Sequence, residues 1–306
     1  MIKMIRELLR QIPLWVTIQE LRREGGCNVF QRLKVQRKIL NTPPVFTEIE
    51  DEVEIHVLTW RKDYINLLWS LKTFYHLSNK KFPLVIHDGG LGESHKLVLK
   101  KHFPNCRLIS RKIANEEVET FLLDNGYNVS NEYRKSNVAT LKVFDYFYYS
   151  RAKRIIHIDS DIVFFKKPDE FLHYINSRKS VFNKDMDYAY STSIEELKEL
   201  TGLNIPPLIN SGLFVIDRES IDLKMIERCL SESSELYDNK WVTEQTLHAI
   251  CATQVDFDFL SEHYLISTKR SNTEDLVCKH YTGFFRPLFY QEGLKKVIDD
   301  KILNFL

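Results

Sequence analysis

Apolar strand-like segments alternate with amphipathic helical segments from residue 51 onward, and this alternation restricts the fold more than any other feature. The pattern predicts strands over 53–59, 82–87, 106–109 and 154–159, separated by helices over 64–75, 93–102, 116–125 and 138–149. Strands separated by helices pair mainly in parallel. The sequence therefore predicts an α/β fold with a mixed, mainly parallel central sheet flanked by helices.

Two aspartates, Asp159 and Asp161, follow the apolar segment 155–158. Side chains alternate along a strand, so the two carboxylates are expected on the same side of the backbone. Ligands of parallel sheets bind beyond the carboxyl ends of the strands. A carboxylate pair at that edge suits Mg²⁺ or Mn²⁺, which could in turn hold the diphosphate of a nucleotide. The alternative is a solvent-facing turn after a core strand.

The Asp-x-Asp pattern also occurs at 185–187 and 256–258, so context has to choose among the three copies. Apolar and acidic residues alternate strictly over 254–260, which is typical of a half-buried strand with a solvated face. The copy at 185–187 lies in a polar, loop-like stretch, and no strand is expected before it. The copy at Asp159 and Asp161 is the one preceded by a buried strand, and it is the favoured metal site.

The overall composition excludes several classes of protein. A formal net charge of +1 gives no electrostatic reason to expect a nucleic-acid partner. The five cysteines form no Cys-x-x-Cys pair, which favours reduced thiols in a cytoplasmic protein over disulfides or a zinc site. No apolar run reaches the ~20 residues of a membrane span, and no signal-peptide core is recognisable at the N-terminus.

The N-terminal segment is strongly basic, with nine lysine and arginine residues and three acidic residues in 1–40. Apolar residues recur there at helical spacing, namely Ile2, Ile5, Leu8, Leu9 and Ile12. A basic amphipathic helix can bind the inner face of a membrane peripherally or dock a partner. It can equally pack on its own domain or on a second subunit of a homo-oligomer. The linker-like stretch 41–44 closes this segment.

Three features are expected in the second half of the chain. Ser193 and Glu196 form a capping box that starts a helix, and Gly202 can end it. The strand 208–217 is interrupted at 210–212, which marks either the close approach of a ligand or another backbone, or a simple β-bulge. A further helix is expected to open at 241–247, with Thr243 as its cap.

Four segments in this order resemble the nucleotide-sugar glycosyltransferases of family 8, which include glycogenin and bacterial lipopolysaccharide galactosyl- and glucosyltransferases. The segments are 158–161, 210–212, 244–245 and the His-Tyr-Thr-Gly-Phe-Phe-Arg-Pro run at 280–287. The resemblance spans residues 51 to 290 and implies the Rossmann-like GT-A fold. It divides the chain into a basic helical extension (1–44), one GT-A domain (45–290) and a C-terminal helical tail (291–306).

The resemblance implies a metal site and a donor-binding site. Asp159, Asp161 and His280 would hold Mn²⁺ or Mg²⁺. Gly283 would let the backbone approach the diphosphate, and Arg286, where the family usually has lysine, would neutralise its charge. Lys142 stands where the family has a donor-binding arginine, although it also reads as an ordinary exposed helix lysine. Further donor-binding residues are implied along the same segments and the first strand, namely Thr59, Trp60, Ser160, Ser211 and Gly212.

The same resemblance assigns the sugar side of the site. Asn210 would lie beside the anomeric carbon, and Asp185 or Asp187 would bind sugar hydroxyls. Gln245, with Glu244 beside it, would lie on the face of the sugar away from the diphosphate. A covalent adduct on Glu244 is the less favoured mechanism.

The expected activity is that of a metal-dependent hexosyltransferase. It would move a sugar from a nucleoside-diphosphate sugar, expected to be a UDP-sugar, to a carbohydrate, glycolipid or small-molecule acceptor, as in polysaccharide biosynthesis, with retention of configuration. The alternatives are an inverting GT-A transferase, a metal-dependent nucleotidyltransferase, and a non-catalytic scaffold that binds sugar nucleotides.

Overall fold

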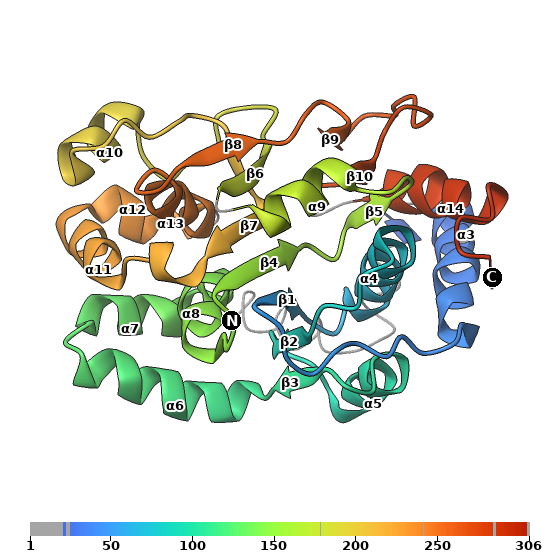
Figure 1. Ribbon diagram of the computed structural model, residues 1–306, viewed down its shortest axis with the longest axis horizontal. Helices are drawn as coiled ribbons and strands as arrows, with labels where there is room; N and C mark the ends of the chain where they lie inside the picture. Colours follow the sequence, from blue (N-terminus) through green and yellow to red (C-terminus); the bar gives the residue numbers. More distant parts are fainter. Residues whose placement is uncertain (1–20, 23–24, 178, 241, 284–285, 305–306) are drawn as a thin grey trace.

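The protein is described by a computed structural model over residues 21–22, 25–177, 179–240, 242–283 and 286–304. A central sheet is formed by β1 (Val53–Thr59), β2 (Leu84–Asp88), β3 (Arg107–Ile109), β4 (Arg154–Ile158), β6 (Ser180–Lys184), β7 (Ile209–Asp217) and β8 (Phe257–Phe259). A smaller sheet contains β5 (Ile162–Phe164), β9 (Tyr264–Ile266) and β10 (Cys278–His280). Helices surround both sheets (Figure 1).

The central sheet is mixed and mainly parallel, as predicted. Its strand order is β3-β2-β1-β4-β7-β6-β8. β1 runs parallel to β2 and β4, β2 runs parallel to β3, and β6 runs parallel to β8. β7 alone is reversed, antiparallel to both β4 and β6. The carboxyl ends of β1, β4 and β6 therefore meet the amino-terminal end of β7 at one edge of the sheet.

The first half of the chain supplies α4 (Tyr64–Ser78), α5 (Glu93–His102), α6 (Arg111–Asp124), α7 (Asn128–Ser136), a short 3₁₀ turn η2 (Val138–Thr140), α8 (Leu141–Tyr149) and α9 (Asp169–Asn176). The second half supplies α10 (Ile194–Thr201), η3 (Arg218–Ser220), α11 (Leu223–Glu232), α12 (Ser234–Asp238), α13 (Thr243–Ala252), a π-helical turn η4 (Phe289–Leu294) and α14 (Lys295–Asp299).

Strand β4 shows how both faces of the sheet are filled. Ile156 and Ile158 point into one hydrophobic cluster, shared with α4, whereas Ile155 points into the other, shared with α8 and α13. This is the period of two expected of a strand that is covered on both sides. Asp159 continues the direction of Ile155, so its carboxylate emerges on the side of α8 and α13.

Several local predictions are confirmed. β1 and α5 begin and end where the sequence pattern placed them. The hydroxyl of Ser193 accepts a hydrogen bond from the Glu196 N–H at 3.1 Å, and Gly202 ends α10 at a φ of 73°. The third Asp-x-Asp copy lies on edge strand β8, where Lys179 pairs with Asp256 and Asp258. Cys106, Cys229, Cys251 and Cys278 are free and buried.

Two local predictions are wrong. A strand does lead into the second Asp-x-Asp copy, because β6 ends directly before Asp185. Thr243 does not cap α13 but is its first residue, preceded by Val242 at the cap position. Its hydroxyl donates instead to the carbonyls of Leu236 and Asn239, which ties the start of α13 to α12.

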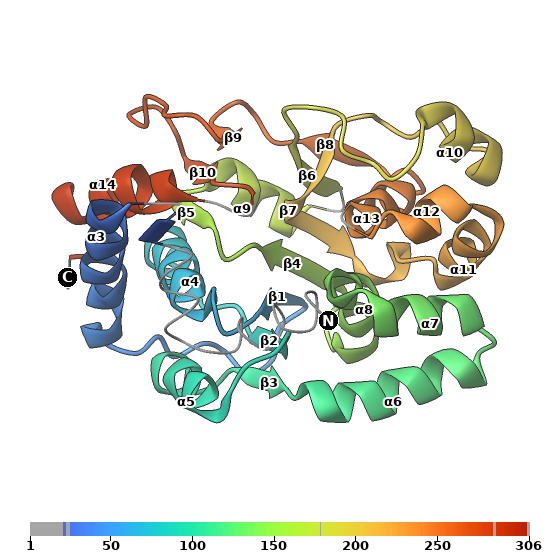
Figure 2. The same ribbon diagram turned by 180° about the vertical axis from the view of Figure 1, so that it is seen from behind.

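The predicted helix over residues 2–12 lies outside the described residues. The described part of the N-terminal segment forms α3 (Gly26–Gln36) and a 3₁₀ turn η1 (Arg37–Asn41). Helix α3 lies beside α14 at one end of the long axis of the molecule (Figures 1 and 2). Among the described helices, none is both long and apolar enough to cross a bilayer.

Candidate active site

A cavity of about 480 Å³ opens at the edge of the sheet where β1, β4 and β6 end. This volume lies within the ordinary range of small-ligand sites. The cavity brings together the residues selected from the sequence, which are Thr59, Trp60, Lys142, Asp159, Ser160, Asp161, Asp185, Asn210, Ser211, Gly212, Glu244, Gln245, His280, Gly283 and Arg286. Asp187 is exposed and is not among its lining residues.

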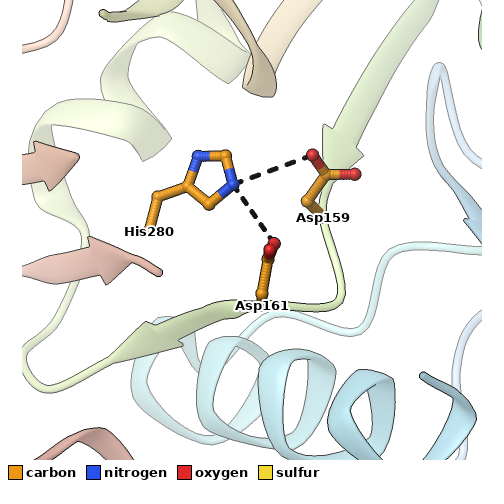
Figure 3. Close-up of side chains that lie close together, drawn as sticks. All are labelled: Asp159, Asp161 and His280. Atoms are coloured by element: carbon orange, nitrogen blue, oxygen red, sulfur yellow. Dashed lines mark ion pairs between the residues drawn. The ribbon is translucent and has the colours of Figure 1, made fainter. Parts of the chain in front are cut away.

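Asp159, Asp161 and His280 converge in this cavity. One possible ligand atom of each lies within 4.8 Å of the others. Figure 3 shows the imidazole Nε2 of His280 directed at both carboxylates, 3.1 Å from Asp161 Oδ1 and 3.9 Å from Asp159 Oδ2. Two hard oxygens and one nitrogen form a donor set that fits Mn²⁺ well and Mg²⁺ less well.

The second oxygen of each carboxylate is held by a cation or a ring N–H. Asp159 Oδ1 lies 2.9 Å from Lys142 Nζ and 2.9 Å from His157 Nε2. Asp161 Oδ2 accepts a hydrogen bond from Arg286 at 2.8 Å. Each aspartate is thus oriented by one oxygen and turns the other toward His280, an arrangement that preorganises a metal site.

These cations also keep the carboxylates ionised. Burial alone would raise the pKa of Asp159, but Lys142 and His157 outweigh it and hold that pKa far below its usual range. For Asp161, Arg286 and His280 outweigh burial in the same way and lower the pKa. Both side chains therefore carry the negative charge that a divalent cation requires.

Pairing between strands explains why His280 reaches the aspartates. β10 runs antiparallel to β5 and places His280 opposite Ile162, while the Tyr281 N–H donates to the Asp161 carbonyl at 3.0 Å. Gly212 packs directly against the imidazole. A Cβ at Gly212 would lie 2.3 Å from His280 Cε1. Only glycine leaves room for this ring.

Segment 210–212 shows both a β-bulge and the close approach of another backbone. The register between β6 and β7 shifts after Phe182, so 211–213 form a bulge. The Gly212 carbonyl accepts a hydrogen bond from the Asp159 N–H at 2.8 Å. The bulge thus brings the backbone of β7 close to the end of β4 and to the His280 imidazole.

A second polar cluster forms another wall of the cavity, where β6 and β7 meet the start of α13. The Gln245 amide oxygen accepts from Asn210 Nδ2 at 3.2 Å, and its nitrogen donates to Asp185 Oδ2 at 3.1 Å and to the Ala189 carbonyl at 2.9 Å. Asn210 Nδ2 also donates to Asp185 Oδ2 at 2.9 Å. Of the two aspartates expected near the sugar, Asp185 therefore lines the cavity and Asp187 does not.

Glu244 lies beside Gln245 and faces Lys142. One carboxylate oxygen accepts from the Ser211 hydroxyl at 3.0 Å and lies 3.8 Å from Lys142 Nζ, and the other lies 3.2 Å from His248 Nε2. Burial alone would raise the pKa of Glu244. Lys142 and His248 outweigh burial and lower the pKa below its usual value, so the carboxyl stays ionised. Lys142 itself is buried, which excludes the reading of an exposed helix lysine.

Asp63, His157 and His248 were not selected from the sequence. Asp63 accepts from Arg286 through both carboxylate oxygens, each at 3.1 Å. Its position just beyond β1, at the same sheet edge, could have identified it. His157 lies on the same strand face as Asp159, and His248 lies one helical turn after Glu244. The strand and helix periodicities could therefore have identified both histidines as neighbours of these acids.

Gly283 and Thr59 complete the cavity. Gly283 has a φ of 103°, a conformation that side chains disfavour. Thr59 ends β1, and its buried Oγ1 has no hydrogen-bond partner among the described residues. Trp60 follows it with 40% of its surface exposed. A hydroxyl and a half-open indole at this edge could contact a bound nucleoside.

The fold has counterparts among solved structures. A mainly parallel sheet flanked by helices, with a carboxylate pair at its carboxyl edge, matches the GT-A fold of solved glycosyltransferases. Among solved structures, the bifunctional glycosyltransferase WbbM matches 82% of this chain with a TM-score of 0.50 at 15% identity. An active-site mutant of LgtC matches 82% of this chain and 95% of its own, with a TM-score of 0.50 at 13% identity.

These matches establish the fold and no finer relationship. This chain covers 51% of the WbbM chain, about half of its length. No protein-family model and no curated protein sequence matches this chain.

Proposed function

We propose that this chain is a metal-dependent hexosyltransferase that moves a sugar from a nucleoside-diphosphate sugar to an acceptor hydroxyl. One observation carries the proposal: Asp159, Asp161 and His280 converge in a cavity at the carboxyl edge of a GT-A sheet. Mn²⁺ or Mg²⁺ bound there would neutralise the diphosphate of the donor as it leaves. The resemblance to family 8 makes a UDP-sugar the first donor to test.

Two cations of the chain flank this site and would bind the leaving diphosphate. Arg286 is held between Asp161 and Asp63, so its planar guanidinium is already oriented for phosphate oxygens. Gly283, near it, would allow the backbone to come close to the same group. Lys142 lies deeper, between Asp159 and Glu244, and would act on the sugar side of the phosphate.

This second wall favours a reaction with retention of configuration. Gln245 is neutral, and its amide is held by Asn210, Asp185 and the Ala189 carbonyl, so it would line the sugar site without attacking the sugar. Glu244 is ionised, and its oxygens are engaged by Ser211, Lys142 and His248, which makes it a poor nucleophile and a good stabiliser of positive charge at the anomeric carbon. The acceptor hydroxyl would attack on the diphosphate side, form the new glycosidic bond as the old bond breaks, and pass its proton to a departing phosphate oxygen.

Calorimetric titration with UDP tests the donor site directly. Binding should require Mn²⁺ or Mg²⁺ and weaken at least about tenfold in Asp161→Asn. Asp258→Asn is the matched control, since it alters an Asp-x-Asp copy on the edge strand, away from the cavity. Equal UDP affinity with and without metal would refute the proposal.

A panel of nucleotide sugars, scored by donor hydrolysis, would then identify the sugar. Proton NMR of the product anomer separates retention from inversion. Release of diphosphate from a nucleoside triphosphate in the presence of a sugar 1-phosphate would instead identify a nucleotidyltransferase. Binding of UDP without hydrolysis of any donor in the panel would favour a sugar-nucleotide-binding scaffold.

A further inference from the structure

Helix α3 has one face that is anchored to the protein. Val29 is buried on this side, and Gln36 Nε2 donates to Asn66 Oδ1 on α4 at 2.8 Å. Trp69 Nε1 donates to the Gln36 carbonyl at 2.8 Å, and the Arg32 guanidinium lies over the Tyr290 ring. These contacts fix the orientation of α3, so its opposite face is presented to the surroundings in a defined way.

The opposite face combines exposed apolar and basic side chains. Phe30 is 68% exposed and Leu33 is 41% exposed, and Lys34 and Arg37 are exposed beside them. Their spacing of i, i+3, i+4 and i+7 places all four on one side of the helix. We call Phe30, Leu33, Lys34 and Arg37 the outer face of α3.

The segment that carries this face has charged side chains of one sign. The sequence has no acidic residue between Glu24 and Glu48, whereas Arg32, Lys34, Arg37 and Lys38 fall within that stretch. Helix α3 also lies at one end of the long axis, beside α14 (Figures 1 and 2).

We propose that the outer face of α3 docks the protein on an anionic lipid bilayer. Phe30 and Leu33 would enter the headgroup region, while Lys34 and Arg37 would pair with lipid phosphates. A second copy of this chain fits less well, because a two-fold contact through this face would bring Lys34 and Arg37 of one copy against the same residues of the other. The inference is independent of the chemistry proposed for the cavity.

Vesicle co-sedimentation of the full chain tests the proposal. We expect binding to phosphatidylcholine vesicles containing about a third phosphatidylglycerol, and much weaker binding to pure phosphatidylcholine. The variants Phe30→Ser/Leu33→Ser and Lys34→Glu/Arg37→Glu should each lower the partition coefficient at least about tenfold. The matched control is Lys112→Glu/Ile113→Ser on α6, where Ile113 is 52% exposed and Lys112 is exposed; it should bind like the unaltered protein.

Thermal unfolding midpoints of all variants should agree within a few degrees, because no altered side chain is buried. The proposal is overturned if the unaltered protein does not bind anionic vesicles, or if the α3 variants bind as well as the control. It is also overturned if sedimentation equilibrium shows a dimer that dissociates in Phe30→Ser/Leu33→Ser, since a second copy would then cover this face. UDP binding is measured separately, so failure of one proposal does not imply failure of the other.

Discussion

Lys142 Nζ lies 2.9 Å from Asp159 Oδ1 and 3.8 Å from Glu244 Oε2. This one buried cation on α8 therefore links the end of β4 to α13. Burial alone would lower the pKa of Lys142, but Asp159 and Glu244 outweigh it and raise the pKa above its usual value. The lysine is therefore charged at neutral pH. Its positive charge compensates the negative charge of both acids.

Replacing Lys142 should destabilise the protein in a metal-dependent way. Lys142→Met leaves Asp159 and Glu244 poorly compensated, at a cost of about 2–4 kcal/mol in the free energy of unfolding. Mn²⁺ should restore part of this loss by binding near Asp159, whereas Lys142→Arg should need less rescue. Urea unfolding with and without Mn²⁺ measures both effects. An equal loss in the two conditions would show that Lys142 does not share the site with the metal.

Asp63→Asn should weaken nucleoside-diphosphate binding through Arg286. The substitution keeps the shape of the side chain but removes the charge that holds the guanidinium, so we expect about a tenfold loss of UDP affinity, equivalent to ~1.4 kcal/mol. The control is a double-mutant cycle with Arg286→Met. Asp63→Asn should change little in that background, and additive effects would argue against the linkage.

Gly212→Ala should reduce metal affinity without altering any ligand. The added methyl would lie 2.3 Å from His280 Cε1 and 2.7 Å from His280 Nδ1, so the imidazole has to move away from the aspartates. We expect at least about a tenfold weaker affinity for Mn²⁺, measured by electron paramagnetic resonance of the free ion. Gly92→Ala is the control, because its nearest atom is an ordinary 3.5 Å away. Unchanged Mn²⁺ affinity in Gly212→Ala would contradict the packing described for His280.

Glu54 should make stability depend on pH in the acid range. Burial raises its pKa, but His56, the Arg151 N–H and Arg107 outweigh this and lower the pKa from 4.5 to about 2. The folded state therefore binds this proton more weakly than the unfolded state. The contribution of Glu54, on the order of 3 kcal/mol, is complete above pH 4.5 and is lost as the pH falls toward 2.

Urea unfolding of the unaltered protein and of Glu54→Gln at several pH values tests this dependence. The difference in stability should be largest near pH 6 and should shrink below pH 4.5. A difference that stays constant down to pH 3 would mean that the pKa of Glu54 is not lowered.

The sequence predicted those parts of the fold that local pattern determines. Strand β1 is apolar along most of its length, and α5 carries its own start and stop signals, so both were placed correctly. Strand β6 reads Ser-Val-Phe-Asn-Lys and has too few apolar residues to stand out. It forms because β7 and β8 pair with it on either side, which is tertiary information.

The same distinction holds for the site. The carboxylate pair and His280 were found because each lies in a recognisable local segment. The position of Asp63 beyond β1 could place it at this edge of the sheet, but its contact with Arg286 joins residues 223 positions apart and no local pattern predicts that pairing. Lys142 was found, but its burial was not, because burial depends on how α8 packs against the end of β4.

The anchored side of α3 has a practical consequence for experiments that shorten the chain. Gln36 donates to Asn66, Asn66 Nδ2 in turn lies 3.4 Å from Asp63 Oδ1, and Ile39 is fully buried. A protein that begins after residue 40 would lose the buried side chains of Val29 and Ile39. It would also lose the hydrogen bond from Gln36 that supports Asn66, and through it Asp63 and Arg286. Loss of vesicle binding or of activity in such a truncation would report damage to the fold. Removing only the residues before 25 leaves this support in place and makes the comparison interpretable.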